Sequence, residues 1–301
     1  MYCVETKSLD HRFANNQIVV NNINLQVIEG SIYGFLGPNG AGKTTTLKLI
    51  LGLLKKQKGE LLIFGKSMEN NRIDILKNIG SLIESPSLYG HLTARENLSL
   101  LQKIYQCPPK RIEEVLHLVG LADTGNKKTS KFSLGMKQRL SIGIALLHNP
   151  KLLILDEPTN GLDPNGMIDI RELLLKLNAE HGITIIISSH ILAEIERLVT
   201  HVGVINNGVM VFQGTLNELK SKQQQHLSIV FDTGDIEKAQ QIFIANNLTA
   251  TIDNGKLSLP TIPKNTIAHI TQQLVKANVD VYEISIVSND LETIFMNLIK
   301  N

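Results

Sequence analysis

The fold of this chain is decided by the stretch Gly37-Pro38-Asn39-Gly40-Ala41-Gly42-Lys43-Thr44. Its spacing is that of the loop that wraps nucleotide phosphates, in which glycines allow backbone conformations that other residues adopt only with strain. An apolar run, residues 31–36, precedes this phosphate loop, and a helical pattern, residues 43–53, follows it. The order strand, loop, helix predicts an ATP-binding site at the start of that helix.

Each position of the phosphate loop has an expected task. Lys43 places a point charge on the β and γ phosphates, and the Thr44 hydroxyl is a candidate ligand for Mg²⁺. The backbone N–H groups of the loop and of the first helical turn face the same anion. We expect ATP to be bound by Gly37, Pro38, Asn39, Gly40, Ala41, Gly42, Lys43, Thr44 and Thr45.

A second motif consists of an apolar run that ends in two acids, Leu152-Leu153-Ile154-Leu155-Asp156-Glu157. Uninterrupted apolar runs are typical of parallel strands that are covered on both faces, and ligands bind at the carboxyl ends of such strands. We therefore predict that Asp156 holds Mg²⁺ and that Glu157 polarises the attacking water. Taken alone, the two acids could also be ordinary surface residues at the end of a strand.

The rest of the first two thirds of the chain alternates between strand and helix. Residues 183–188 form another apolar run, and helical patterns cover residues 165–180 and 191–199. This alternation favours a doubly wound α/β layer. Residues 202–212 contain two short apolar runs around Asn206-Asn207-Gly208, which predicts a hairpin.

A helical subdomain, about residues 85–147, is inserted between the phosphate loop and the acidic strand. Helical periodicity covers residues 92–105, 109–119 and 134–147, and Thr93 to Glu96 has the spacing of a capping box.

After Gly214 the composition changes. Strand patterns at 227–231, 249–252, 257–259 and 279–286 and helical patterns at 236–246, 267–277 and 291–299 predict a small α+β tail.

Composition excludes several classes of protein. The net charge is +2, and no Lys/Arg run is dense enough to favour nucleic-acid binding. Cys3 and Cys107 form neither a zinc pattern nor a disulfide framework, so we expect reduced thiols in a cytoplasmic protein. The N-terminus lacks the pattern of a signal peptide, and the longest apolar runs are too short to cross a bilayer.

The stretch Phe132-Ser133-Leu134-Gly135-Met136-Lys137-Gln138-Arg139 resembles the signature motif of the ATPase subunits of ABC transporters. Together with the phosphate loop and the acidic strand, the resemblance covers roughly residues 1–215. It implies that Ser133 and Gly135 contact ATP bound to a second ATPase subunit, expected to be another copy. It also implies that Phe13 stacks on adenine, that His190 contacts the γ-phosphate and that Asp163 lies in the loop through which subunits sense each other.

Without the resemblance, Ser133 would be a plain helix cap, Phe13 a core residue and His190 a structural histidine. One departure from the family pattern concerns Glu84, which stands where a glutamine is usual. A carboxylate there can still meet Mg²⁺ and the attacking water, but it adds negative charge beside a polyphosphate. A misaligned loop glutamate is the alternative. Glu84 and the signature together resemble the ATPase subunits of bacitracin-type and lantibiotic-immunity exporters.

The implied fold class is α/β: a phosphate-loop ABC cassette, residues 1–215, with a mixed sheet core and a helical subdomain, followed by a small α+β domain, residues 216–301. The implied activity is ATP hydrolysis with ATP and Mg²⁺ that drives peptide-antibiotic efflux through separate integral membrane permease subunits. Such a subunit lies in the cytoplasm, peripheral on the inner face of the cell membrane. Alternatives are the ATPase of a general drug or lipid exporter or of an importer, and a non-transport or regulatory ABC ATPase.

Overall fold

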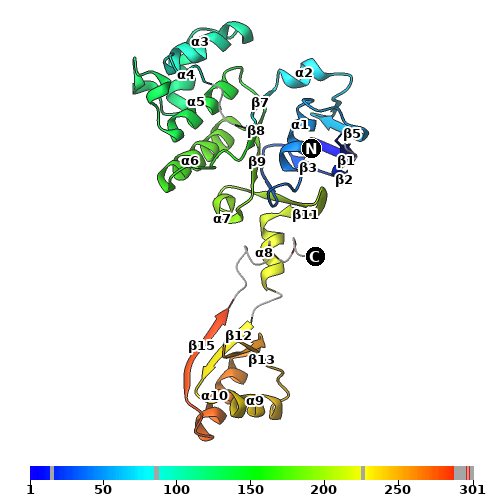
Figure 1. Cartoon of the computed structure of the whole chain (residues 1–301), viewed down its shortest axis with the longest axis vertical. Coiled ribbons are helices and arrows are strands. Elements are labelled where there is room, and N and C mark those ends of the chain that lie inside the picture. Colours follow the sequence, from blue (N-terminus) through cyan, green and yellow to red (C-terminus); the bar gives the residue numbers. More distant parts are fainter. Residues whose placement is uncertain (14–16, 85–87, 225–227, 288–295, 297, 299–301) are drawn as a thin grey trace. The chain divides into compact units, whose positions relative to one another are not determined.

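The computed structural model describes residues 1–13, 17–84, 88–224 and 228–287, together with Met296 and Leu298. The chain divides into two compact units, one built on Met1–Leu216 and the other on Asn217–Asn297 (Figure 1). Each unit has a hydrophobic core of its own. Within the described residues, no helix is long and apolar enough to span a membrane.

The first unit is organised by a six-stranded sheet with the order β11-β10-β4-β9-β8-β7. Its strands are β4 (Ile32–Leu36), β7 (Ile79–Leu82), β8 (Leu152–Asp156), β9 (Thr184–Ser189), β10 (His201–Asn206) and β11 (Val209–Thr215). All pairs are parallel except β10 with β11. Every residue of β4, β8 and β9 is buried, as their uninterrupted apolar runs predict. The expected mixed sheet is confirmed, and it brings the carboxyl ends of β4 and β8 to one edge.

A second, antiparallel sheet packs against the helix that follows the phosphate loop, so that this helix lies between the two sheets. It consists of β1 (Tyr2–Arg12), β2 (Ile18–Ile23), β3 (Gln26–Ile28), β5 (Lys58–Ile63) and β6 (Lys66–Ser67). Its inward side chains share one core with α1 (Lys43–Ile50) and with the six-stranded sheet. Sequence analysis did not predict this sheet, because bulges in β1 interrupt the strict alternation that marks a half-buried strand.

The helical subdomain contains α3 (Ala94–Tyr105), α4 (Lys110–Leu118) and α5 (Leu134–Leu146), close to the expected ranges. Figure 1 shows these helices together on the side of the core sheet away from β1 and β2. The capping box is present: the Thr93 N–H donates to Glu96 Oε2 at 2.6 Å, and the Glu96 N–H donates to Thr93 Oγ1 at 3.1 Å. Both reciprocal bonds satisfy N–H groups that the helix itself leaves open.

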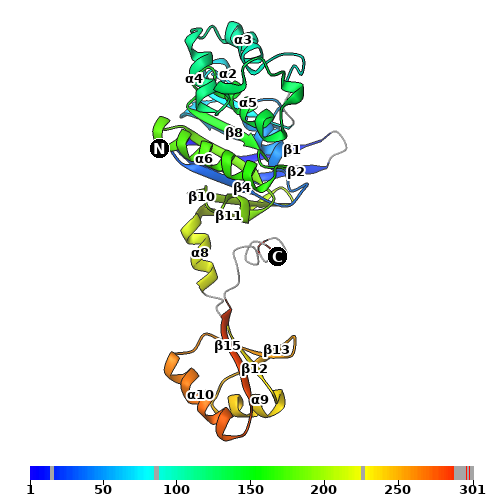
Figure 2. The ribbon, with the colours of Figure 1, turned by 90° about the vertical axis from the view of Figure 1, so that its left-hand side faces the viewer.

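Among the described residues, three more α-helices belong to the first unit, and a fourth begins at its end. They are α2 (Arg72–Leu76), α6 (Pro164–His181), α7 (Leu192–Ile195) and α8 (Leu216–Gln224). Helix α6 packs against β9 and covers a face of the core sheet (Figure 2). The helix expected over residues 191–199 is wrong in length, since regular helix ends at Ile195 and turns lead into β10. Helices α2 and α8 were not predicted.

The predicted hairpin is β10 and β11, joined by the two-residue turn Asn207-Gly208. Both turn residues have positive φ, 46° and 78°, as a type I′ turn requires. The Gly208 N–H donates to the Ala41 carbonyl at 2.9 Å, so the tip of the hairpin is tied to the phosphate loop.

The second unit follows the order β12 (Ser228–Thr233), α9 (Ile236–Ala245), β13 (Thr251–Asp253), β14 (Lys256–Pro260), α10 (Lys264–Lys276) and β15 (Val281–Val287). Its sheet is antiparallel with the order β13-β14-β12-β15, the arrangement of a split β-α-β fold. Phe231 and Phe243 lie in its core, with ring centroids 5.1 Å apart. The helix expected over residues 291–299 lies outside the described residues, apart from Met296 and Leu298.

Candidate nucleotide site

The phosphate loop joins the end of β4 to the start of α1. Gly42 precedes the helix with φ 107°, and Gly40 has φ 81°. A Cβ atom on Gly42 would lie 2.6 Å from the Val19 carbonyl oxygen, and one on Gly37 would collide with the Ile205 carbonyl. Position 42 therefore requires glycine for both backbone conformation and close approach, position 40 for its conformation, and position 37 for close approach. The result is a tight turn that precedes the N-terminus of α1.

Lys43 is almost fully buried, with a side chain 4% exposed. Its Nζ donates to the carbonyls of Gly37 at 2.8 Å and Pro38 at 3.2 Å. It also lies 3.3 Å from Glu157 Oε1. A buried ammonium needs such partners, because desolvation without compensation is costly. The cation is thus held inside the loop that was predicted to receive phosphate.

Asp156, at the end of β8, is buried and accepts two hydrogen bonds. Thr44 Oγ1 donates to Asp156 Oδ2 at 2.7 Å, and Ser188 Oγ donates to Asp156 Oδ1 at 2.5 Å. Ser188 Oγ in turn accepts from the backbone N–H of Glu157 at 2.9 Å. Two of the three predicted Mg²⁺ ligands, Thr44 and Asp156, are therefore in direct contact. Ser188 was missed, because a serine inside an apolar strand carries no spacing signal of its own.

Glu157 follows the strand with a positive φ of 45°, a conformation that a non-glycine residue adopts only when its surroundings hold it. Its Oε2 lies 3.2 Å from His190 Nδ1, and its Oε1 faces Lys43. His190 comes directly after β9 and Glu157 directly after β8, and both lie close to Lys43 at the start of α1, which follows β4 and the phosphate loop. Their meeting is what the parallel sheet order predicts for residues at carboxyl strand ends.

Glu84 lies two residues beyond β7 and has a positive φ of 66°. Its Oε1 is 2.5 Å from the Nζ of Lys48, which lies one helical turn after Thr44 on α1. Glu84 shares with Thr44, Asp156 and Glu157 a cleft of about 390 Å³, whose other lining residues are Leu134, Gln138 and Asn160. The structure thus brings Glu84 to the predicted site and gives it a cationic partner that sequence analysis missed.

A neighbouring cleft of about 320 Å³ places Phe13 beside the phosphate loop. Its lining residues are Phe13, Gln17, Val19, Asn39, Gly40, Gly42, Lys43, Thr44, Thr45 and Glu157. Phe13 is 45% exposed and touches His11 edge to face. The alternative of a core phenylalanine is therefore wrong, since the ring lies at the mouth of a polar cleft.

The residues of the signature motif lie at the start of α5, where Ser133 and Leu134 are exposed although most of the helix is buried. Ser133 caps α5 by accepting from the Met136 N–H at 3.2 Å, and Asp163 caps α6 by accepting from the Gly166 N–H at 2.9 Å. A Cβ atom added to Gly135 would lie 3.9 Å from Gly166, so the two helix starts are neighbours. None of Ser133, Gly135 and Asp163 lines either cleft at the phosphate loop of their own chain.

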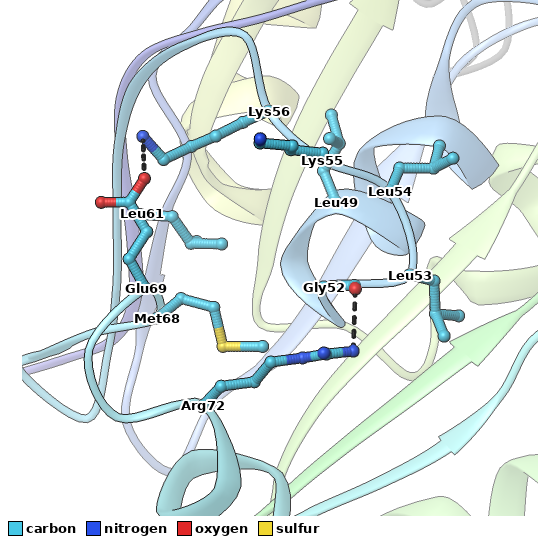
Figure 3. Close-up of a pocket in the computed structure, with 10 residues that line it drawn as sticks. All are labelled: Leu49, Gly52, Leu53, Leu54, Lys55, Lys56, Leu61, Met68, Glu69 and Arg72. Carbon is cyan, nitrogen blue, oxygen red and sulfur yellow. Dashed lines mark hydrogen bonds and ion pairs between the residues drawn. The ribbon is translucent and has the colours of Figure 1, made fainter.

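Figure 3 shows a further cleft, of about 420 Å³, at the opposite end of α1. It is lined by Leu49, Gly52, Leu53, Leu54, Lys55, Lys56, Leu61, Met68, Glu69 and Arg72. Lys56 Nζ pairs with Glu69 Oε1 at 2.8 Å, and Arg72 Nη2 donates to the Gly52 carbonyl at 3.0 Å (Figure 3). The floor is apolar and the rim is mostly basic, which suits contact with another chain better than chemistry.

Comparison with known proteins finds these motifs together in ABC transporter ATP-binding proteins. Residues 20–160 match the family model described as ABC transporter. The chain is 43% identical over 307 aligned positions to a bacitracin transport ATP-binding protein of Bacillus licheniformis, covering 98% of this chain and 97% of that one. It is 44% identical to a lantibiotic transport ATP-binding protein of Streptococcus pyogenes, covering 65% of this chain and 83% of that one.

A solved structure resembles the first unit. It is the dimeric, post-hydrolysis form of an ATP-binding cassette with ADP and phosphate bound. The match has a TM-score of 0.63 and 28% identity, and it covers 71% of this chain and 98% of that one.

Proposed function

Because the chain belongs to the ABC transporter family of ATP-binding proteins, we propose that it is the ATP-hydrolysing subunit of an exporter of peptide antibiotics of the bacitracin or lantibiotic type. One observation carries the proposal: the similarity to a bacitracin transport ATP-binding protein extends over 98% of the chain, including the tail beyond the cassette. Glu84 and the signature that starts at Ser133 agree with that branch of the family.

ATP binds along the two clefts at the phosphate loop. The exposed ring of Phe13 stacks on adenine, while the loop N–H groups and the N-terminus of α1 receive the phosphates. Lys43 is buried beside the loop and needs only to exchange the Gly37 and Pro38 carbonyls for phosphate oxygens. The glycine positions keep the backbone close enough for these contacts.

The side chains beside Lys43 fit a magnesium ion. Thr44 and Asp156 point a hydroxyl and a carboxylate at each other, and Ser188 fixes the second Asp156 oxygen. No group of three or more His, Cys, Asp or Glu side chains in the described part of the chain could hold a metal by itself. This agrees with Mg²⁺, which binds through one or two protein oxygens and the substrate phosphates. When bound, the ion neutralises charge on the phosphates, and Glu84 lies near enough to contribute an oxygen.

Glu157 is the proposed base that polarises the attacking water. In the structure its carboxylate is shared between Lys43 and His190. When a phosphate group binds Lys43, Oε1 of Glu157 loses its contact with the lysine. That oxygen can then accept a proton from water. His190 holds the other oxygen and so keeps the carboxylate oriented, and it lies where it can also donate to the γ-phosphate.

A second copy completes the site. Ser133, Gly135 and Asp163 lie outside the clefts of their own chain, at two neighbouring helix starts. In an isologous dimer each of these helix starts faces the phosphate loop of the partner. The similarity to a dimeric cassette with ADP and phosphate bound supports this arrangement.

Membrane subunits supply the substrate pathway, and the chain lies against them on the inner face of the cell membrane. We place their contact at the segment from Glu84 to His91 and at the cleft of Figure 3. Residues 85–87 of that segment are outside the described part of the chain. Leu53 is 60% exposed at the cleft and Ile73 of the adjoining α2 is 73% exposed, so an apolar segment would cover both. Helix α1 then links the partner to the phosphate loop.

The test is antibiotic resistance. The chain is expressed with the membrane proteins of neighbouring reading frames in a sensitive bacterium, and minimal inhibitory concentrations are measured for bacitracin, a lantibiotic and an unrelated drug. We expect protection against one of the peptides, lost in Glu157→Gln. Protection against the unrelated drug alone would favour a general exporter, and no protection at all together with ATP-dependent uptake would favour an importer.

A further inference from the structure

The pair formed by Lys48 and Glu84 is not explained by the roles assigned so far. Lys48 Nζ lies 2.5 Å from Glu84 Oε1, and the side chains are 30% and 66% exposed. An isolated ion pair with this exposure contributes little to stability. Its location is unusual, however, because Glu84 lines the cleft that also contains Thr44, Asp156 and Glu157.

The cleft already contains a high density of negative charge before nucleotide enters. Asp156 and Glu157 supply two carboxylates, and the phosphates of ATP add several more charges. A third carboxylate, at position 84, would repel the phosphates unless a cation compensates it. Lys48 lies on the same face of α1 as Thr44, four residues on, and so provides that cation beside the cleft.

We propose that Lys48 is the positioning residue for Glu84: it neutralises the carboxylate and holds it at the cleft that also contains Thr44, Asp156 and Glu157. The proposal deepens the ATPase function above and rests on it. The left-handed backbone of Glu84, at φ 66°, is consistent with a side chain held from outside its own segment. The pair also ties the segment after β7 to the helix that receives the phosphates.

The proposal predicts a dependence between two substitutions. Lys48→Met leaves Glu84 uncompensated, so the affinity for Mg-ATP falls about tenfold at low ionic strength, and the loss shrinks as salt screens the charge. Glu84→Gln removes the charge that Lys48 compensates and keeps an amide oxygen in its place, so it is the reference for the double variant. The double variant regains the affinity of Glu84→Gln, and Lys48→Arg retains that of the wild type.

The experiment measures Mg-ATP binding by isothermal titration calorimetry on the full chain, together with KM and kcat for hydrolysis. Lys103→Met, which removes an exposed helical lysine of α3, is the control for loss of a positive charge. Equal affinities for Lys48→Met and Lys103→Met would overturn the proposal, and so would a double variant as weak as Lys48→Met. Binding and hydrolysis are separate readouts, so a chain that binds ATP but fails to hydrolyse it refutes the ATPase function and still tests the pair.

Discussion

Lys43 and Glu157 are held against each other, with Nζ of the lysine 3.3 Å from Oε1 of the glutamate. The cation that is expected to bind phosphate is therefore paired with the acid that is expected to activate water. Each has a second partner: Lys43 the loop carbonyls, Glu157 the ring of His190. We therefore expect the two functions to be coupled, because a phosphate that attracts Lys43 would change the surroundings of Glu157.

Glu157→Gln tests that coupling. The variant keeps its shape and its contact with His190 but loses the charge that competes with phosphate for Lys43. We expect ATP to bind at least as tightly as in the wild type and kcat to fall by a factor of about 100 or more. Nucleotide affinity and turnover are measured on the same preparation. A variant with nearly normal turnover would remove Glu157 from the catalytic role.

Ser188→Ala tests the support of Asp156. The substitution leaves Asp156 Oδ1 and the Glu157 N–H without their shared partner, at a cost of about 1–3 kcal/mol in stability. The Mg²⁺ concentration for half-maximal activity should rise about tenfold, as for other residues that orient a metal ligand. Ser141→Ala is the matched control, since it removes a buried hydroxyl of α5 that donates to the Lys137 carbonyl. An unchanged Mg²⁺ requirement in Ser188→Ala would contradict the assignment.

Phe13→Ala tests the adenine contact. Stacking of a base on an aromatic ring contributes about 1–3 kcal/mol, so ATP affinity should fall about tenfold or more, while Phe13→Trp keeps it. The melting temperature should change little, because the ring is 45% exposed. Tyr2, at the other end of β1 and 42% exposed, provides the control Tyr2→Ala. Equal ATP affinities for the two alanine variants would show that Phe13 does not contact the base.

Leu53→Glu tests the contact with membrane subunits. A carboxylate at the apolar cleft of Figure 3 would have to be desolvated by a partner, which is costly. We expect the isolated chain to hydrolyse ATP normally and to lose co-purification with its membrane partner. Leu175→Glu, at a 39% exposed leucine of α6, is the control and should co-purify. Normal co-purification of Leu53→Glu would place the partner elsewhere.

The sequence predicted the parts of the site that have strict spacing. The phosphate loop was predictable because its backbone conformation requires glycines at a fixed spacing. The acids at the end of β8 were predictable because they directly follow an apolar run. The capping box at Thr93 was predictable for the same reason. His190 was assigned to the γ-phosphate through the family resemblance alone, and its contact with Glu157 follows from the pairing of β8 with β9 in the fold.

The parts that the sequence left open depend on contacts between distant residues. Ser188 and Lys48 are ordinary residues in a strand and a helix, and only the fold puts them beside Asp156 and Glu84. The antiparallel sheet was missed because bulges in β1 break the alternation of its apolar positions. Helix α8 was missed because residues 216–224 have a mostly polar composition, without a clear apolar periodicity.

The most direct test of the account is whether a peptide antibiotic stimulates ATP hydrolysis by the complex of this chain with its membrane subunits in lipid vesicles. We predict that bacitracin or a lantibiotic raises the rate of phosphate release several-fold above the basal rate, and that Glu157→Gln abolishes both rates. A complex that hydrolyses ATP at a rate insensitive to these peptides, but responds to lipids or unrelated drugs, would contradict the proposal of peptide-antibiotic export.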